Sequence, residues 1–315
     1  MKEKKRFDQH KSSSNSNWTE LGPINTPIIL SNGKKRGNGR INCIAFDPFD
    51  KEKIWVGSPG GGLWSSPDGG NTWSTNSDGL PVIGVSYIAI NPIDPQEMYI
   101  TTGDAHASDT YSIGILKSND GGQTWDTTGM QFAVTDDKMV NKVIIHPTFT
   151  DSLFAVTDNN IKISPDGGQT WSNALSTSGS VLSGYFRDIE FKPNNPNVLY
   201  AVKQTTGSSQ VYKSSDRGQT WSVAMNGIST VNRNRPLLAV TPANPDAVYV
   251  LFCMNDYGFH GIYKSTDNAD SWTLQSDSPN ILGRNTDGTS TGGQSWYDLS
   301  SVSYTHLTLP TILLV

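Results

Sequence analysis

The sequence predicts an all-β protein built from five copies of one four-stranded unit, and a recurring turn motif is the main observation behind this prediction. The motif is S-x-D-x-G-x-[TS]-W, and in its last copy Ala269 replaces the glycine. Its five tryptophans lie 46 to 52 residues apart, and a constant period of this length indicates a repeated supersecondary unit. The motif residues are Ser66, Asp68, Gly70 and Trp73; Ser118, Asp120, Gly122 and Trp125; Ser164, Asp166, Gly168 and Trp171; Ser214, Asp216, Gly218 and Trp221; and Ser265, Asp267 and Trp272.

Each copy of the motif has the composition of a tight turn between two strands. The aspartate can accept hydrogen bonds from backbone N–H groups a few residues further on, as in Asx-turns. The glycines permit a positive φ at little steric cost. We therefore assign the motif a structural role, with no catalytic function for its aspartates and with all five tryptophans buried.

A second motif recurs between the turns and supplies the remaining strands. It is an apolar segment that ends in proline, such as 44–48 and 88–92, followed by an aromatic-rich segment such as 54–56. A third short segment leads into each turn, and the fourth strand begins at the tryptophan. Helical periodicity is absent. Units of four short strands cannot bury their apolar faces alone, so neighbouring units must pack face to face as blades of a β-propeller.

The repeats also set the domain organisation. We expect a disordered, charged and serine-rich arm at 1–17, which is not a signal peptide, and one truncated propeller at 18–301. Within it, 18–23 resembles a closing outer strand and 292–300 opens a sixth blade, so the ring should be incomplete, with five full blades plus partial ones. The segment 302–315 resembles a translated sequencing adapter and is excluded from the fold.

Charge and cysteine content exclude several classes of function. The net charge is −5 and no dense basic stripe is present, so nucleic acid is not an expected partner. No segment has the length and hydropathy of a membrane span. Cys43 and Cys253 fall in strands of the first and fifth units, and we expect two unpaired buried thiols.

The turns resemble Asp-box (BNR) repeats, which occur in sialidases, sortilin-type receptors and xyloglucan-active glycoside hydrolases. The wider sequence is similar to large secreted Bacteroidota proteins with a sortilin-like propeller, further domains and a sorting signal for type IX secretion. The resemblance implies an extracellular or cell-surface location and further domains in a longer chain. The segments that carry it are 39–48, 60–64, 80–85, 109–114, 278–283 and 292–300.

The resemblance also raises two enzymatic alternatives, which the residues do not favour. Xyloglucan-active relatives use two carboxylates as acid and base, and the position that matches the first of them holds Pro59. Sialidases need an arginine triad, but Arg40, Arg187, Arg233, Arg235 and Arg284 show no spacing that marks one. For Arg187 we expect an ion pair along its own strand, with Asp188 or Glu190.

Two polar segments are candidate ligand or metal sites. Asp104, His106 and Asp109 lie in a loop that follows a second strand, and oxygen ligands there suit Ca²⁺; the alternative is a loop whose aspartates bond the local backbone. Asp256 and Tyr257 combine a polar and an aromatic side chain, which suits contacts with a sugar or peptide or packing between blades. No other cofactor is indicated.

These observations lead to three hypotheses for the function. The main one is a non-catalytic module that binds a peptide or glycan or serves as a scaffold. A glycoside hydrolase-like module that acts on polysaccharide is the first alternative, and a purely structural part of a larger surface protein is the second. Whether the chain is an enzyme stays open, with the residues leaning against it, because fold alone does not determine activity.

Overall fold

The computed structural model describes residues 39–107, 110–285, 287–296 and 299, and the structural statements below concern these residues. Contacts divide the chain into Met1–Gly39 and Arg40–Val315, and all described strands belong to the second unit. The predicted arm, the strand at 18–23 and the adapter-like segment at 302–315 lie outside the described residues.

Five β-sheets make up the second unit, and in each of them four antiparallel strands follow one another in chain order. The sheets, first to fifth, contain β1 (Cys43–Phe46), β2 (Ile54–Ser58), β3 (Gly62–Ser66) and β4 (Ser74–Thr75); β5 (Val85–Ile90), β6 (Met98–Thr102), β7 (Gly114–Ser118) and β8 (Asp126–Gln131); β9 (Val140–Ile145), β10 (Leu153–Thr157), β11 (Ile161–Ser164) and β12 (Ser172–Asn173); β14 (Tyr185–Lys192), β15 (Asn195–Gln204), β16 (Gln210–Ser214) and β17 (Thr220–Val223); and β18 (Pro236–Val240), β19 (Val248–Cys253), β20 (Phe259–Ser265) and β21 (Thr273–Ser276). One further strand, β13 (Leu175–Ser176), pairs parallel with β17 at the outer edge of the fourth sheet. The 3₁₀ turn η1 (Val134–Asp136) is the one helical element in the described part of the chain.

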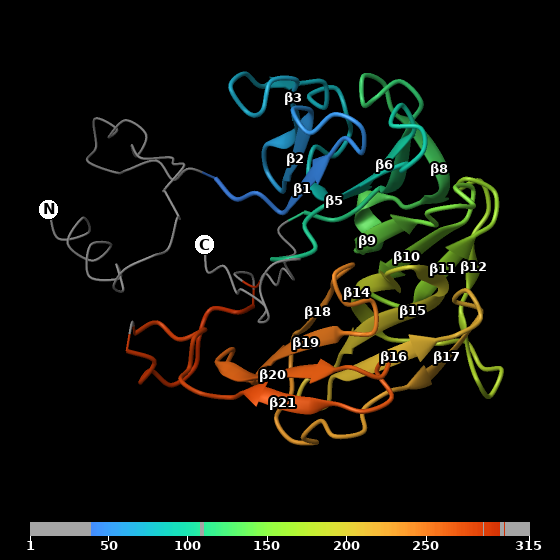
Figure 1. Ribbon diagram of the computed structural model, residues 1–315. Coiled ribbons are helices and arrows are strands. Elements are labelled where there is room, and N and C mark those ends of the chain that lie inside the picture. Colours follow the sequence, from blue (N-terminus) through green and yellow to red (C-terminus); the bar gives the residue numbers. More distant parts are fainter. Residues whose placement is uncertain (1–38, 108–109, 286, 297–298, 300–315) are drawn as a thin grey trace, which may run out of the picture. The chain divides into compact units, whose positions relative to one another are not determined.

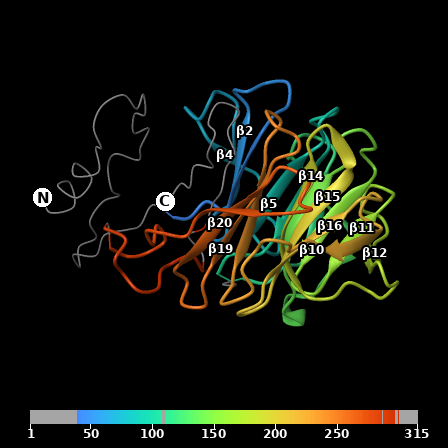
Figure 2. The same ribbon diagram turned by 60° about the horizontal axis from the view of Figure 1, so that its bottom comes forward.

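Successive sheets pack face to face, and their first strands touch one another in the order β1, β5, β9, β14 and β18. The sheets therefore fan out from a line of first strands, as Figures 1 and 2 show. This radial arrangement of four-stranded sheets is that of propeller blades, which confirms the predicted all-β propeller fold. Among the described strands, no comparable packing joins β18–β21 back to β1–β4.

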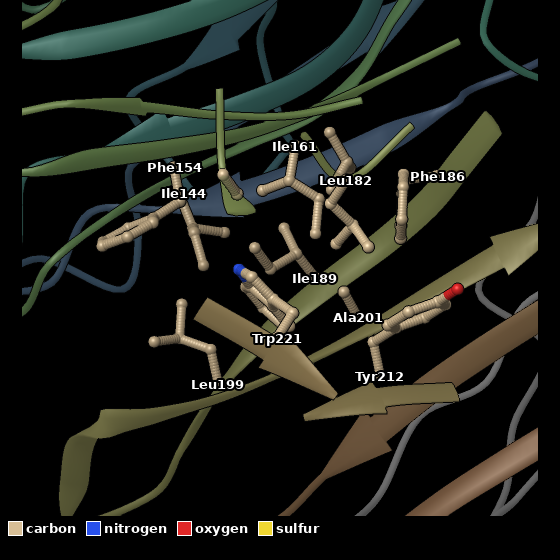
Figure 3. Packing of buried hydrophobic residues seen from close by; sticks show 12 residues of the cluster. Ile144, Phe154, Ile161, Leu182, Phe186, Ile189, Leu199, Ala201, Tyr212 and Trp221 are labelled. Carbon is tan, nitrogen blue, oxygen red and sulfur yellow. The ribbon is translucent and has the colours of Figure 1, made fainter. Parts of the chain in front are cut away.

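The hydrophobic core is divided into clusters that lie between neighbouring sheets. The cluster between the third and fourth sheets surrounds Trp221, which is 1% exposed and lies among Ile144, Phe154, Ile189 and Leu199 (Figure 3). Side chains of both sheets contribute to it because successive residues of a strand point to opposite faces, so every blade offers one apolar face to each neighbour. The repeated tryptophan of one sheet thus packs against the sheet before it.

The prediction that all five motif tryptophans are buried is wrong for the first of them. Trp73 is 40% exposed, and Ile44, Phe46 and Trp64 of the same sheet are exposed as well. The reason follows from the packing rule, because no sheet precedes β1–β4 in the described part of the chain. Trp221 and Trp272 are buried, and Trp125 and Trp171 are half-buried within clusters shared by two sheets.

The five motif turns share one hydrogen-bond pattern. In the third copy the Ser164 hydroxyl donates to Oδ1 of Asp166 at 2.8 Å, and the N–H of Gly168 donates to the Ser164 hydroxyl at 2.9 Å. The N–H and hydroxyl of Thr170 donate to the two oxygens of the same carboxylate, at 2.9 and 2.6 Å. Each turn is thereby closed by its own side chains, and Ala269 adopts the positive φ (67°) that glycine supplies in the other copies.

Two expectations about the rest of the chain can be compared with the structure. Cys43 and Cys253 are free thiols; Cys253 is buried and Cys43 is half-buried. Burial raises the pKa of the Cys43 thiol to about 12. The described residues contain no helix with the length and hydropathy that a membrane crossing requires.

Candidate functional site

The antiparallel order of the strands sorts the loops into two ends. First strands begin and second strands finish at one end, which we call the arginine end after Arg40, Arg187 and Arg235. The prolines that follow the first strands and the five motif turns lie at the opposite end, the proline end. The arginine end carries the polar loop at 103–107 and is the candidate site.

The loop at 103–107 follows β6 and is held by backbone contacts. The N–H of Gly103 donates to the carbonyl of Gly84 at 2.8 Å, and the N–H of Ala105 donates to the Ser86 hydroxyl at 2.9 Å. Gly103 has φ 93°, and a Cβ there would lie 3.0 Å from backbone atoms of Thr110, Tyr111 and Ser112. The sequence thus needs glycine here, and the tight turn directs the next three residues toward other sheets.

Asp104 is fully buried and forms an ion pair with Arg40, which precedes β1. Its Oδ1 also accepts the N–H of His106 at 3.0 Å and the amide of Asn42 at 3.4 Å. Burial alone would raise the pKa of Asp104, but the His106 N–H and the Arg40 charge outweigh it and lower this pKa. The carboxylate is therefore a structural anion that fixes the loop to the first sheet.

Two further arginines reach the same loop from the fourth and fifth sheets. Arg187 of β14 donates to the carbonyl of Ala105 and to Oε1 of Gln204, both at 2.5 Å. Arg235, just before β18, bonds Nδ1 of His106 at 2.5 Å and the carbonyl of Trp296. A loop of the second sheet thus connects three other sheets across the line of first strands.

These contacts shift the pKa values of the groups at the arginine end. Burial, together with the charges of Arg235 and Arg187, lowers the pKa of His106 to about 3, so its imidazole is neutral at physiological pH. Burial and the charge of Arg187 lower the pKa of Arg235 to about 9. The neutral imidazole can therefore accept a hydrogen bond from the guanidinium, which stays protonated at neutral pH.

The expected ion pair of Arg187 with Asp188 or Glu190 is wrong. Arg187 lies where the register of β14 against β15 shifts, between Phe186 and Asp188, and its guanidinium bonds Gln204 and Ala105 instead. The two carboxylates bind Lys142 of β9 instead, at 2.8 and 2.6 Å. Burial would lower the pKa of Lys142, but both carboxylates outweigh it and raise this pKa well above its usual value. The Lys142 Nζ also lies 5.0 Å from the centre of the Tyr87 ring. Lys142 thus links its own strand, β9, to the first strands β5 and β14 on either side.

The structure brings together only some of the predicted site residues. Asp104 and His106 meet the three arginines, and Asp109 lies outside the described residues. Asp256 accepts the N–H of Gly258 at 3.0 Å within the turn after β19. Tyr257 is 37% exposed, and its charge is one of several weaker influences that raise the pKa of Arg187 against the larger effect of burial. No group of three metal-ligating side chains occurs among the described residues.

The sequence reasoning missed that the arginines converge. Their separations along the chain are large, but Arg40, Arg187 and Arg235 lie six to eight residues before the proline that ends each first strand. Position within the repeat, rather than spacing along the chain, was the signal that could have grouped them. Asp158 lies at the same end, because it directly follows the second strand β10. Burial raises the pKa of its half-buried carboxyl.

A separate cavity of about 700 Å³ opens at the proline end. Its walls come from the second to fifth sheets and are mainly apolar, with Ile90, Pro92, Pro147, Phe191, Pro193 and Pro242 among them. No aspartate or glutamate lines it. The cavity therefore lacks the carboxylic acids that glycoside hydrolysis uses, and the arginine end is the better candidate for a polar ligand.

Comparison with known proteins agrees with the class that the fold defines, a propeller with Asp-box turns. The Sortilin-Vps10 family (Sortilin, neurotensin receptor 3) matches residues 159–280. A xyloglucanase of Paenibacillus sp. is 27% identical over 215 residues, which cover 59% of this chain and 21% of that protein. The chain thus spans about a fifth of the length of this curated relative.

Solved structures give the same result for the fold. A crystal structure of an ancestral GH74 enzyme superposes with a TM-score of 0.60 at 18% identity, covering 75% of this chain and 31% of that one. The GH74 xyloglucanase from Xanthomonas campestris gives a TM-score of 0.58 at 16% identity, covering 79% and 39%. The chain therefore shares the propeller fold of GH74 enzymes, and its sequence is similar in part to the Sortilin-Vps10 family and to a xyloglucanase.

Proposed function

We propose that this chain is part of an extracellular, glycoside hydrolase-like protein that acts on polysaccharide, and that the arginine end is its ligand face. The observation that carries the proposal is the similarity to a xyloglucanase over 215 residues. It favours the hydrolase alternative over the non-catalytic module that the residues alone had favoured.

The composition of the arginine end suits a sugar ligand. Sugar sites combine aromatic faces with a few fixed polar groups. Tyr257 and Tyr111 are 37% and 38% exposed, and the Arg187 guanidinium carbon lies 4.1 Å from the centre of the Tyr185 ring. Because Arg187 is held between that ring, Gln204 and the Ala105 carbonyl, its remaining N–H groups have a fixed direction before any ligand arrives.

Hydrolysis of a glycosidic bond needs a carboxylic acid that protonates the leaving oxygen. Pro59, after β2, cannot fill this role, and Asp104 is buried and ionised. Asp158 is half-buried, and it directly follows the second strand β10 as Pro59 follows β2. Burial raises the pKa of its carboxyl, as a proton donor requires. We assign Asp158 as the proton donor of this propeller.

Non-catalytic binding of a glycan is the second candidate, and Pro59 favours it. The resemblance places a catalytic carboxylate of xyloglucan-active relatives at this position, where proline has no proton to transfer. On this alternative, the arginine end binds polysaccharide and cleavage takes place elsewhere or not at all.

One set of measurements tests both candidates. The purified chain is incubated with xyloglucan, polygalacturonate, glucuronoxylan and mixed-linkage glucan; binding is measured by affinity electrophoresis and cleavage by release of reducing ends. We expect binding, and a loss of any cleavage by about 10²-fold or more in Asp158→Asn. Asp126→Asn, an exposed carboxylate at the proline end, is the matched control. Binding without cleavage would leave the second candidate, and binding to none of the polymers would refute the proposal.

A further inference from the structure

The groups that contact the loop at 103–107 carry a net positive charge. Arg40, Arg187 and Arg235 face one another across the loop, and Asp104 is the carboxylate that neutralises one of them. Arg187 and Arg235 take part in no ion pair among the described residues. Their acceptors are carbonyl oxygens, an amide oxygen and a neutral imidazole.

Holding two such cations together is unfavourable. Arg235 is only 4% exposed, and buried charges in proteins are usually paired with an opposite charge. The repulsion between the two arginines is visible in the pKa of Arg235. Burial lowers this pKa most, and the charge of Arg187 lowers it further. An anion that enters this site would relieve the repulsion, so its binding is favoured before any other contact is counted.

The site leaves donors for such an anion. Arg187 uses Nε and Nη1 for Gln204 and Ala105, and its Nη2 has no hydrogen-bond partner in the described part of the chain. The side chain is half-buried, and its unpaired Nη2 is not among the fully buried polar atoms. Tyr185 lies against one face of the guanidinium, which leaves its edge as the donor surface. An edge with fixed, planar N–H groups matches the geometry of a carboxylate.

We propose that the arginine end binds a polysaccharide that carries carboxylates, with a uronic acid unit placed against Arg187, whose charge adds to that of the buried Arg235. This inference rests on the proposed function, because it takes the ligand to be a glycan. A uronic acid fits better than a neutral sugar because it supplies the missing negative charge. The exposed Tyr257, in the turn after β19 at the same end, offers a ring surface for the adjoining sugar unit.

Isothermal titration calorimetry with three matched ligands tests the inference: oligogalacturonide, the same oligosaccharide after carboxyl reduction, and a neutral xyloglucan oligosaccharide. We expect the acidic ligand to bind at least tenfold more tightly than its reduced form, and this preference to weaken with added salt. Arg187→Gln should reduce acidic binding by about 10- to 100-fold. Arg187→Lys should keep only part of the acidic binding, since lysine keeps the positive charge but lacks the paired, planar N–H groups that bind a carboxylate in two places.

Arg217→Gln is the control, because Arg217 lies in a motif turn at the proline end. There it stacks over the Phe149 ring and donates a hydrogen bond to Asn197. A thermal midpoint within 2 °C of the wild type, taken as an order-of-magnitude tolerance, shows that each variant has folded. Equal binding of the acidic and carboxyl-reduced ligands overturns the inference and leaves the proposed function intact. Binding of no glycan overturns the proposed function and the inference with it. Selective binding of a peptide through its C-terminal carboxylate would also overturn the inference, in favour of a peptide ligand.

Discussion

Replacement of Trp221 by alanine is the strongest single test of how the blades are held together. This indole is 1% exposed, fills the space between the third and fourth sheets, and donates its N–H to the carbonyl of Gly218 at 2.8 Å. A buried aromatic side chain removes about 150–250 Å² from water, and at about 25 cal/mol per Å² this is worth about 4–6 kcal/mol. Because folded chains relax around a cavity only in part, we expect Trp221→Ala to cost about 3–5 kcal/mol.

Trp73→Ala is the matched control, because the same motif position is 40% exposed in the first sheet. Solvent can fill the space left there, so no closed cavity forms, and we expect a cost of about 1–2 kcal/mol. Urea unfolding at neutral pH, followed by far-ultraviolet circular dichroism, gives both values without relying on tryptophan fluorescence. Losses that agree within about 0.5 kcal/mol, the usual effect of a surface change, would refute packing of each indole on the preceding sheet.

Three further predictions follow from contacts described above. Lys142→Met leaves the buried Asp188 and the half-buried Glu190 without their cation and should lower stability by about 3–5 kcal/mol, measured by the same urea unfolding; a loss below about 1 kcal/mol would show that the charge cluster contributes little. Gly129→Ala should cost about 1–3 kcal/mol because a Cβ would lie 1.9 Å from the carbonyl oxygen of Gln169, whereas Gly60→Ala, where nothing lies within 4 Å, should be near neutral; equal thermal midpoints would contradict this contact. The Thr124 hydroxyl and N–H lower the pKa of Asp120 from 3.8 to about 2, so this turn contributes stability above pH 4 that is lost as pH falls toward 2; Asp120→Asn should therefore flatten acid unfolding in that range, and an unchanged acid profile would speak against it.

The repeat made the fold predictable because each motif turn is determined by its own residues. Asp166 and Thr170 bond each other whatever lies around them, so the strand order of a blade follows from local sequence. Exposure of Trp73 was not predictable in this way, since it depends on which sheet stands next to it. The site was less predictable still. Arg187 had two acidic neighbours in sequence, but the register irregularity of β14 at Arg187 and a loop from another sheet determine its real partners.

Strand β13 has a consequence for how the molecule opens. The chain leaves the third sheet at Ala174, whose N–H still bonds the carbonyl of Ile161, and the next residue, Leu175, already pairs with Thr220 of β17 in the next blade. These two blades therefore share a continuous piece of backbone at their outer rim as well as a common apolar interface. Local opening events should release them as one cooperative unit, with amide protons of 174–177 exchanging together with those of β17, while the remaining blades can separate singly.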